Sequence, residues 1–137
     1  MLTTWSFPTT VVFGACALSA LAGHVKRFGL ARVLLVTDAG VARAGIASRV
    51  QDALQRGDVT ATIFDKVDAN PVEQNIVDGV EAYRAAGAQA VVAVGGGSPL
   101  DAGKLIALKV THDRPLADYD DALGGDRHIQ ARSDQLR

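Results

Sequence analysis

The 137-residue sequence has little cysteine, few aromatic residues and almost no net charge. Its single cysteine excludes an internal disulfide and fits a reducing cytoplasm. The formal net charge of -1 gives no electrostatic reason to expect nucleic acid or an acidic membrane surface as a partner. Aromatic residues make up only 5% of a chain that is 48% hydrophobic, so Ala, Val and Leu must build most of the core.

The sequence also lacks an apolar run long enough for a membrane span. The uncharged stretch 11–23 is shorter than the roughly 20 residues that a bilayer requires, and no Lys or Arg precedes it to begin a signal peptide. We predict a short strand at residues 10–13 and a helix at 15–27 that ends at Gly29. Cys16 is interpreted as a small packing residue of that helix rather than a nucleophile. These features predict a cytoplasmic protein with no membrane partner.

The rest of the chain alternates strand patterns with helix patterns. Strands are predicted at residues 32–37, 59–64 and 88–94, and helices at 41–55, 72–86 and 98–111. Because consecutive parallel strands need right-handed crossovers, the helices must cover both faces of one sheet. The predicted fold class is therefore α/β, a Rossmann-like, doubly wound parallel sheet.

The most informative stretch is a glycine loop between the last predicted strand and helix. Residues 91–94 form the continuous apolar run of a strand covered on both faces. Ser98 is predicted to cap the following helix, with Pro99 at its first position and Asp101 completing a capping box. Three glycines remove every Cβ where ligand oxygens would approach the backbone, namely Gly95, Gly96 and Gly97. A helix N-terminus behind such a loop favours an anion such as a pyrophosphate, although a tight turn alone also explains three glycines.

The flanking residues favour the binding loop over the tight turn. The string Gly-Gly-Gly-Ser-x-x-Asp-x-x-Lys at residues 95–104 resembles the cofactor-loop signature of the iron-containing, or group III, alcohol dehydrogenases. Glycerol dehydrogenases, dehydroquinate synthases and maleylacetate reductases usually depart from this signature. Further matches to the family extend the resemblance over roughly residues 7–121. They are Phe13-Gly14, the strand and turn at 34–40, Asn70-Pro71 and Asp118-Tyr119-Asp120.

The resemblance implies an NAD-binding domain at residues 1–125. From the sequence alone, Asp38 is better explained as a helix cap, but the resemblance reverses this preference, because the family position lies beside the adenosine ribose. A carboxylate there accepts hydrogen bonds from ribose hydroxyls and repels a 2′-phosphate, which favours NAD over NADP. The cofactor-binding residues that the resemblance implies are Asp38, Asn70, Gly95, Gly96, Gly97, Ser98 and Asp101.

The metal site of the family has no counterpart in the sequence. Family members bind Fe²⁺ (or Zn²⁺) through one Asp and three His of a helical domain. His24, His112 and His128 lack the i, i+4 spacing of paired metal ligands and are interpreted as ordinary surface residues. Beyond residue 121 the family's Thr-rich cofactor loop and helical domain are not found, so no catalytic residue or metal ligand is expected here. Residues 126–137 are predicted to be a polar, disordered tail.

Three hypotheses about function remain open. The chain is the NAD-binding domain of an iron-type oxidoreductase acting on a small alcohol or aldehyde, and is inactive on its own. Alternatively it is a stand-alone nucleotide-binding module, or a non-functional truncated fragment. The implied partners are a dinucleotide and a small alcohol or aldehyde, together with either a second copy of the chain or a separate helical domain.

Overall fold

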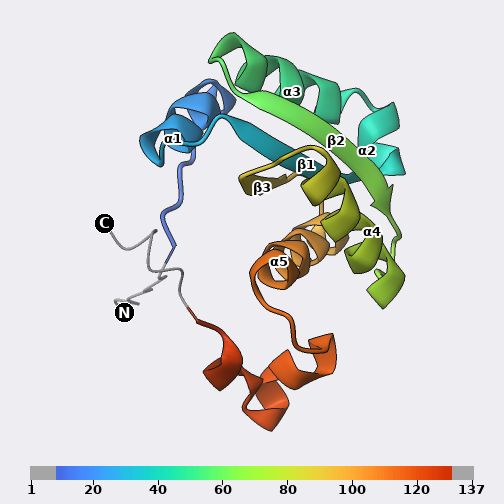
Figure 1. The fold of residues 1–137 in the computed structure, drawn as a ribbon. Helices are drawn as coiled ribbons and strands as arrows, with labels where there is room; N and C mark the ends of the chain where they lie inside the picture. Colours follow the sequence, from blue (N-terminus) through green and yellow to red (C-terminus); the bar gives the residue numbers. More distant parts are fainter. Residues whose placement is uncertain (1–8, 131–137) are drawn as a thin grey trace, which may run out of the picture.

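The computed structural model describes residues 9–130 and centres on a three-stranded parallel sheet with the order β2-β1-β3 (Figure 1). The strands are β1 (Arg32–Asp38), β2 (Thr60–Val67) and β3 (Ala90–Ala93). The α-helices are α1 (Leu21–Arg27), α2 (Ala39–Arg43), α3 (Ile46–Arg56), α4 (Glu73–Ala85) and α5 (Gly97–Thr111). Short 3-10 helices are η1 (Ala17–Ala20), η2 (Leu116–Tyr119), η3 (Asp121–Leu123) and η4 (Gly125–His128).

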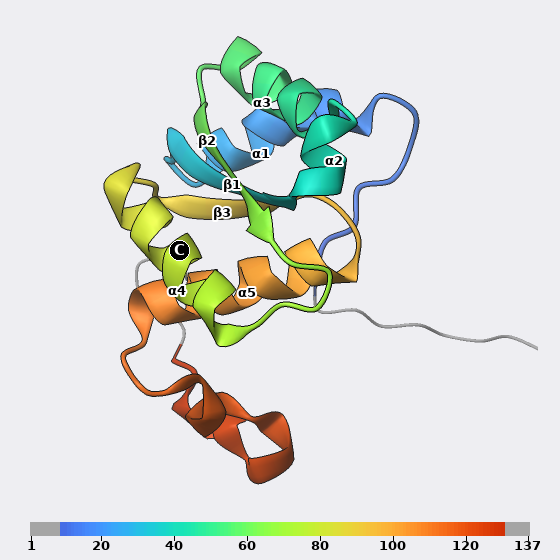
Figure 2. The same cartoon turned by 90° about the vertical axis from the view of Figure 1, so that its right-hand side faces the viewer.

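Helices cover both faces of the sheet, which confirms the predicted doubly wound α/β fold. Helices α1 and α3 lie on one face, and α4 and α5 lie on the other (Figure 2). The central strand β1 contributes to both cores because its side chains alternate between the faces. Val33 and Leu35 pack in the core with α1 and α3, whereas Leu34 and Val36 pack in the core with α4 and α5. No helix in residues 9–130 is long and apolar enough to cross a membrane.

A Leu34→Ala substitution is expected to lower the free energy of unfolding by about 3 kcal/mol, because it leaves a cavity in a close-packed core. Leu34 has no exposed surface and lies in the core with Phe64 and Ile106. Urea unfolding followed by circular dichroism measures the change. Leu123→Ala is the control, since Leu123 is 77% exposed and its truncation should leave the unfolding midpoint nearly unchanged. Equal stabilities of the two variants would contradict this account of the core.

The predicted helix at residues 41–55 is two helices in the structure. Helix α2 ends at Arg43, and α3 begins at Ile46. Gly45 lies between them with a φ of 75°, a left-handed conformation that interrupts the helical hydrogen bonds. The break leaves Ile46 43% exposed, while Val50 and Leu54 are buried as their spacing predicts.

The predicted strand at residues 10–13 is absent from the structure. No strand among residues 9–130 pairs with this segment, and its apolar side chains are exposed, Phe13 by 98%. The helix predicted at 15–27 forms as η1 followed by α1. The packing role proposed for Cys16 is wrong, because Cys16 is exposed and has a φ of 62° ahead of η1.

The last predicted strand is shorter and less covered than the sequence indicates. Strand β3 pairs only with β1, so it is an edge strand of the described sheet, and all four of its residues are half-buried. The expectation of full burial at residues 91–94 is therefore wrong. At the C-terminal end, residues 126–128 lie in η4 and residues 126–130 are exposed, while residues 131–137 of the predicted tail lie outside the described residues.

Candidate cofactor-binding site

A cleft of about 480 Å³ lies at the carboxyl end of the sheet. Strand β1 continues into α2 and α3 on one face, whereas β3 continues into α5 on the opposite face (Figure 2). The connections therefore diverge between β1 and β3, the place where doubly wound sheets bind ligands. The cleft is lined by Asp38, Ala39, Gly40, Val67, Asp68, Ala69, Gly96, Gly97, Ser98 and Pro99.

A hydrogen bond fixes the two strand ends at this point. Thr37 is fully buried at the end of β1, and its hydroxyl donates to the carbonyl oxygen of Val94 over 2.8 Å. The bond holds the chain leaving β3 beside the chain leaving β1. Thr37 was not predicted as a functional residue, because its only signal in the sequence is that a polar residue ends an apolar strand.

The glycine loop has the space and the donors that an anion needs. Gly95 has a φ of 143°, and a Cβ there would lie 2.8 Å from Cγ of Pro99, so only glycine fits. A Cβ at Gly96 or Gly97 would meet nothing within 4 Å, so the loop faces open space. In the described part of the chain, no acceptor receives the N–H of Gly97 or Ser98. These two N–H groups lie at the N-terminus of the 15-residue helix α5, which is the positive end of the helix dipole.

The cap predicted for this helix is wrong. The N-cap residue is Gly96, and the hydroxyl of Ser98 donates instead to the carbonyl oxygen of Ala69 over 2.6 Å. Ser98 therefore joins the start of α5 to the loop after β2. Asp101 does not reach back to Ser98, because its carboxylate lies 3.2 Å from the ammonium group of Lys104 in an exposed ion pair. Pro99 is the third helical residue rather than the first.

Asp38 lies at the end of β1 with one oxygen engaged and the other facing the loop. Its Oδ1 accepts a hydrogen bond of 2.8 Å from the N–H of Val41 and so caps α2. Its Oδ2 lies 3.5 Å from the position that a Cβ on Gly95 would take. The helix-cap interpretation of Asp38 is thus confirmed, and a second carboxylate oxygen lies beside the glycine loop.

The turn between β2 and α4 depends on Asn75, which sequence analysis missed. This buried side chain accepts from the N–H of Val72 at 3.0 Å and donates to Asp68 Oδ2 at 3.1 Å. It thereby holds the Asp68 carboxylate at the edge of the cleft. Asn70 lies exposed in the preceding bend and is not among the residues that line the cleft. The signal for Asn75 was its position three residues after the N-cap of α4.

The histidines do not converge on a point. No group of three or more His, Cys, Asp or Glu residues within 9–130 could hold a metal ion. His112 ends α5, and its Nε2 accepts from the N–H of Gln130 over 3.0 Å. Its Nδ1 then carries the proton and lies 3.1 Å from the carbonyl oxygen of Leu108. The imidazole therefore links the end of α5 to the C-terminal segment.

Relatives with known activities match most of this chain. A 4-hydroxybutyrate dehydrogenase of Cupriavidus necator is 40% identical over 120 residues, which are 88% of this chain and 31% of that protein. A choline dehydrogenase of Bacillus subtilis is 35% identical over 121 residues, 88% of this chain and 30% of that protein. The chain thus spans about 30% of the length of these curated relatives.

Solved structures agree with the sequence matches. A 1,3-propanediol oxidoreductase superposes with a TM-score of 0.74 at 35% identity, covering 77% of this chain and 28% of that one. A sulfoacetaldehyde reductase from Bifidobacterium kashiwanohense in complex with NAD⁺ has a TM-score of 0.74 at 31% identity, covering 87% and 31%. The family model described as iron-containing alcohol dehydrogenase matches residues 8–135. This chain therefore belongs to the iron-containing alcohol dehydrogenase family.

Proposed function

We propose that the chain is the NAD-binding part of a metal-dependent dehydrogenase of small alcohols or aldehydes. The observation that carries the proposal is the cleft between β1 and β3, where an open glycine loop, free helix N–H groups and a carboxylate meet. Relatives that reduce or oxidise alcohols and aldehydes, and a neighbour bound to NAD⁺, support it.

Each residue of the cleft has a distinct part in this proposal. The N–H groups of Gly97 and Ser98 donate to the pyrophosphate oxygens, and Gly95 and Gly96 let the phosphates approach the backbone. The free oxygen of Asp38 accepts from the adenosine ribose hydroxyls. Asn70 and Asp101 are exposed and do not line the cleft, so we assign them only outer contacts with the cofactor. Bound NAD would accept the hydride that leaves the alcohol carbon.

Metal binding belongs to polypeptide other than residues 9–130. Stabilising an alkoxide in a metal-dependent dehydrogenase takes a cation with about three protein ligands, and the described residues offer no such set. For this reason we assign the chain the binding and orientation of the dinucleotide and no chemical step. The same observation favours a second candidate function, a nucleotide-binding module without catalysis.

Replacing Asp38 with glycine should raise the affinity for NADP relative to NAD by about tenfold, because the carboxylate that repels a 2′-phosphate is gone. The ratio of the two dissociation constants, measured by isothermal titration calorimetry, reports the change. Asp38→Asn separates the effect of the charge from the effect of the cap. Asparagine removes the negative charge but caps helices as well as aspartate does.

Both variants should shift the ratio in the same direction, with Asp38→Asn retaining the stability of the parent. A ratio that moves in neither variant would show that Asp38 only caps α2. Calorimetry of the parent chain tests the proposed function itself. We expect one NAD site per chain, and the absence of any binding heat with NAD or NADP at several temperatures would refute the function.

A further inference from the structure

Two acidic residues end neighbouring strands at the cleft, and the proposed function uses only Asp38. Asp38 pairs in register with Val67 of β2, so Asp68 directly follows its partner. Adjacent strands lie about 4.8 Å apart, which places both acidic residues on the same side of the cleft that they line. None of the described residues that line the cleft is Lys, Arg or His, and neither carboxylate belongs to an ion pair within residues 9–130.

Each of these two carboxylates has one oxygen left for a ligand. Oδ1 of Asp38 caps α2, which leaves its Oδ2. Oδ2 of Asp68 accepts from Asn75, and in the described part of the chain its Oδ1 has no hydrogen-bond partner. The cleft therefore offers two separate carboxylate oxygens as acceptors.

The buried amide of Asn75 fixes the orientation of Asp68. Asn75 is only 7% exposed, and its oxygen accepts from the N–H of Val72. Its nitrogen donates to the carbonyl oxygen of Lys66 at 3.2 Å and to Asp68 Oδ2 at 3.1 Å. Only this orientation of the amide satisfies one donor and two acceptors at once, so the side chain cannot turn without losing all three bonds.

The residue after Asp68 is tied to the phosphate side of the cleft. The carbonyl oxygen of Ala69 accepts from the hydroxyl of Ser98, the second residue of α5. Acceptors on the β1 and β2 side thus face a ligand together with the N–H donors at the start of α5. This polarity fits a molecule that carries a diphosphate at one end and hydroxyl donors at the other.

We propose that Asp68 is a second ribose-binding residue and that Asn75 is the residue that positions it. The inference rests on the proposed function, in which Asp38 binds the adenosine ribose. A ribose has two neighbouring hydroxyls, and Asp38 has one free oxygen. Asp38 Oδ2 accepts from one hydroxyl, and Asp68 Oδ1 accepts from the other.

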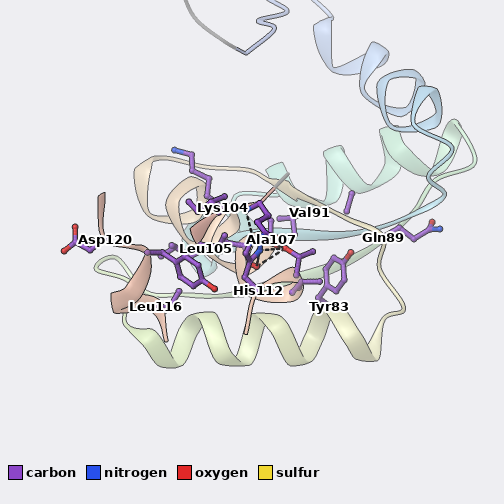
Figure 3. A pocket seen from close by; sticks show the side chains of 16 residues that line it. Tyr83, Gln89, Val91, Lys104, Leu105, Ala107, His112, Leu116 and Asp120 are labelled. Atoms are coloured by element: carbon purple, nitrogen blue, oxygen red, sulfur yellow. Dashed lines mark hydrogen bonds between the residues drawn. The ribbon is translucent and has the colours of Figure 1, made fainter. Parts of the chain in front are cut away.

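A larger groove, of about 750 Å³, runs along α5 and has no such pair of acceptors (Figure 3). Leu105 and Leu116 are among its apolar lining residues, and its one carboxylate belongs to Asp120. The ammonium group of Lys104 also lines it, so its two charged side chains have opposite signs. The cleft is therefore the place where a ribose meets two carboxylates.

Calorimetry with ADP and with 2′,3′-dideoxy-ADP tests the role of Asp68, because the second ligand lacks both ribose hydroxyls. The parent chain should bind ADP about 100-fold more tightly than the dideoxy analogue, and Asp68→Ala should lower this ratio to about tenfold. Asp65→Ala is the matched control, since Asp65 is exposed on β2 and does not line the cleft. It should keep the ratio of the parent.

Asn75→Asp tests the positioning role through its pH profile. The substitution keeps an acceptor for Val72 and places a carboxyl against Asp68. At about pH 8 the two carboxylates repel, and the ratio should fall about tenfold. At about pH 5.5 the ratio should recover, because burial and a like charge raise the pKa of such a carboxyl and a shared proton restores the contact.

Gln74→Glu is the control for this exchange. Gln74 is exposed on α4, and its amide also donates to a carboxylate, that of Asp78 at 2.7 Å. Its ratio should match the parent at both pH values. An Asn75→Asp ratio that is equal at both pH values would contradict the positioning role.

The outcomes separate this inference from the proposed function. If the parent chain binds neither NAD nor ADP, the proposed function fails. If it binds NAD but not ADP, or if Asp68→Ala keeps the ratio of the parent, the inference fails and the proposed function stands. Asp68→Ala decides even if Asn75→Asp does not fold by circular dichroism, because Asp68 is exposed.

Discussion

A Gly96→Val variant is expected to bind NAD about 100-fold more weakly than the parent chain, a loss of about 2.7 kcal/mol. Gly96 lines the cleft and caps α5 with a φ of -81°, which lies outside the left-handed region that favours glycine. A Cβ there meets no atom within 4 Å, so the fold stays intact and the branched side chain fills the space that the phosphates need. Calorimetric titration with NAD measures the loss.

Gly23→Val is the matched control for this substitution. Gly23 is exposed on α1, away from the cleft, and a Cβ there also meets nothing within 4 Å. The Gly23→Val variant should bind NAD with parent affinity and keep its fold, because valine has a slightly higher helix propensity than glycine. Parent affinity in Gly96→Val, or an equal loss in both variants, would contradict the assignment of the glycine loop as the phosphate site.

The chain alone is expected to reduce no NAD with ethanol, propanediol or butanol, even when Fe²⁺ or Zn²⁺ is supplied. Hydride transfer in this class needs the alkoxide stabilised by a bound cation, and residues 9–130 hold no cluster of three or more metal-ligating side chains. The absorbance of NADH at saturating alcohol and metal is the measurement. We expect no rate above the protein-free reaction.

A full-length member of the family, assayed in the same buffers, controls for metal loading and cofactor quality. The Gly96→Val variant, purified in parallel, is the control for contaminating host dehydrogenase. A contaminant would form NADH in both preparations. Metal-dependent NADH formation by the parent chain and not by this variant would contradict the prediction. It would place a metal site among residues interpreted here as structural.

The sequence predicts those parts of the fold that depend on local pattern. The apolar run at residues 32–37 predicts the strand β1, whose Val33, Leu34, Leu35 and Val36 are buried in the structure. The spacing of Ile76, Val80 and Tyr83 predicts the buried face of α4. The glycine loop can also be recognised in the sequence, because the backbone at Gly95 has a conformation that only a residue without a Cβ can adopt.

Contacts between distant segments account for most of what the sequence did not reveal. Ser98 follows the pattern of a helix cap, yet its hydroxyl donates to the carbonyl oxygen of Ala69, 29 residues away in sequence, over 2.6 Å. The segment at 10–13 has the composition of a strand, but no strand within residues 9–130 pairs with it. Thr37 likewise bonds to Val94, which is distant in sequence and which the sheet topology brings beside it.

The central claim is that the N-terminus of α5 holds the pyrophosphate of a dinucleotide, and an NMR titration of ¹⁵N-labelled chain with NAD tests it most directly. We predict saturable shifts at the amides of Gly96, Gly97 and Ser98, together with Asp38, and little change at Gly23. Inorganic pyrophosphate should shift the loop amides and leave Asp38 nearly unmoved. Shifts confined to the groove along α5, or no shift at the loop at saturating NAD, would contradict the account.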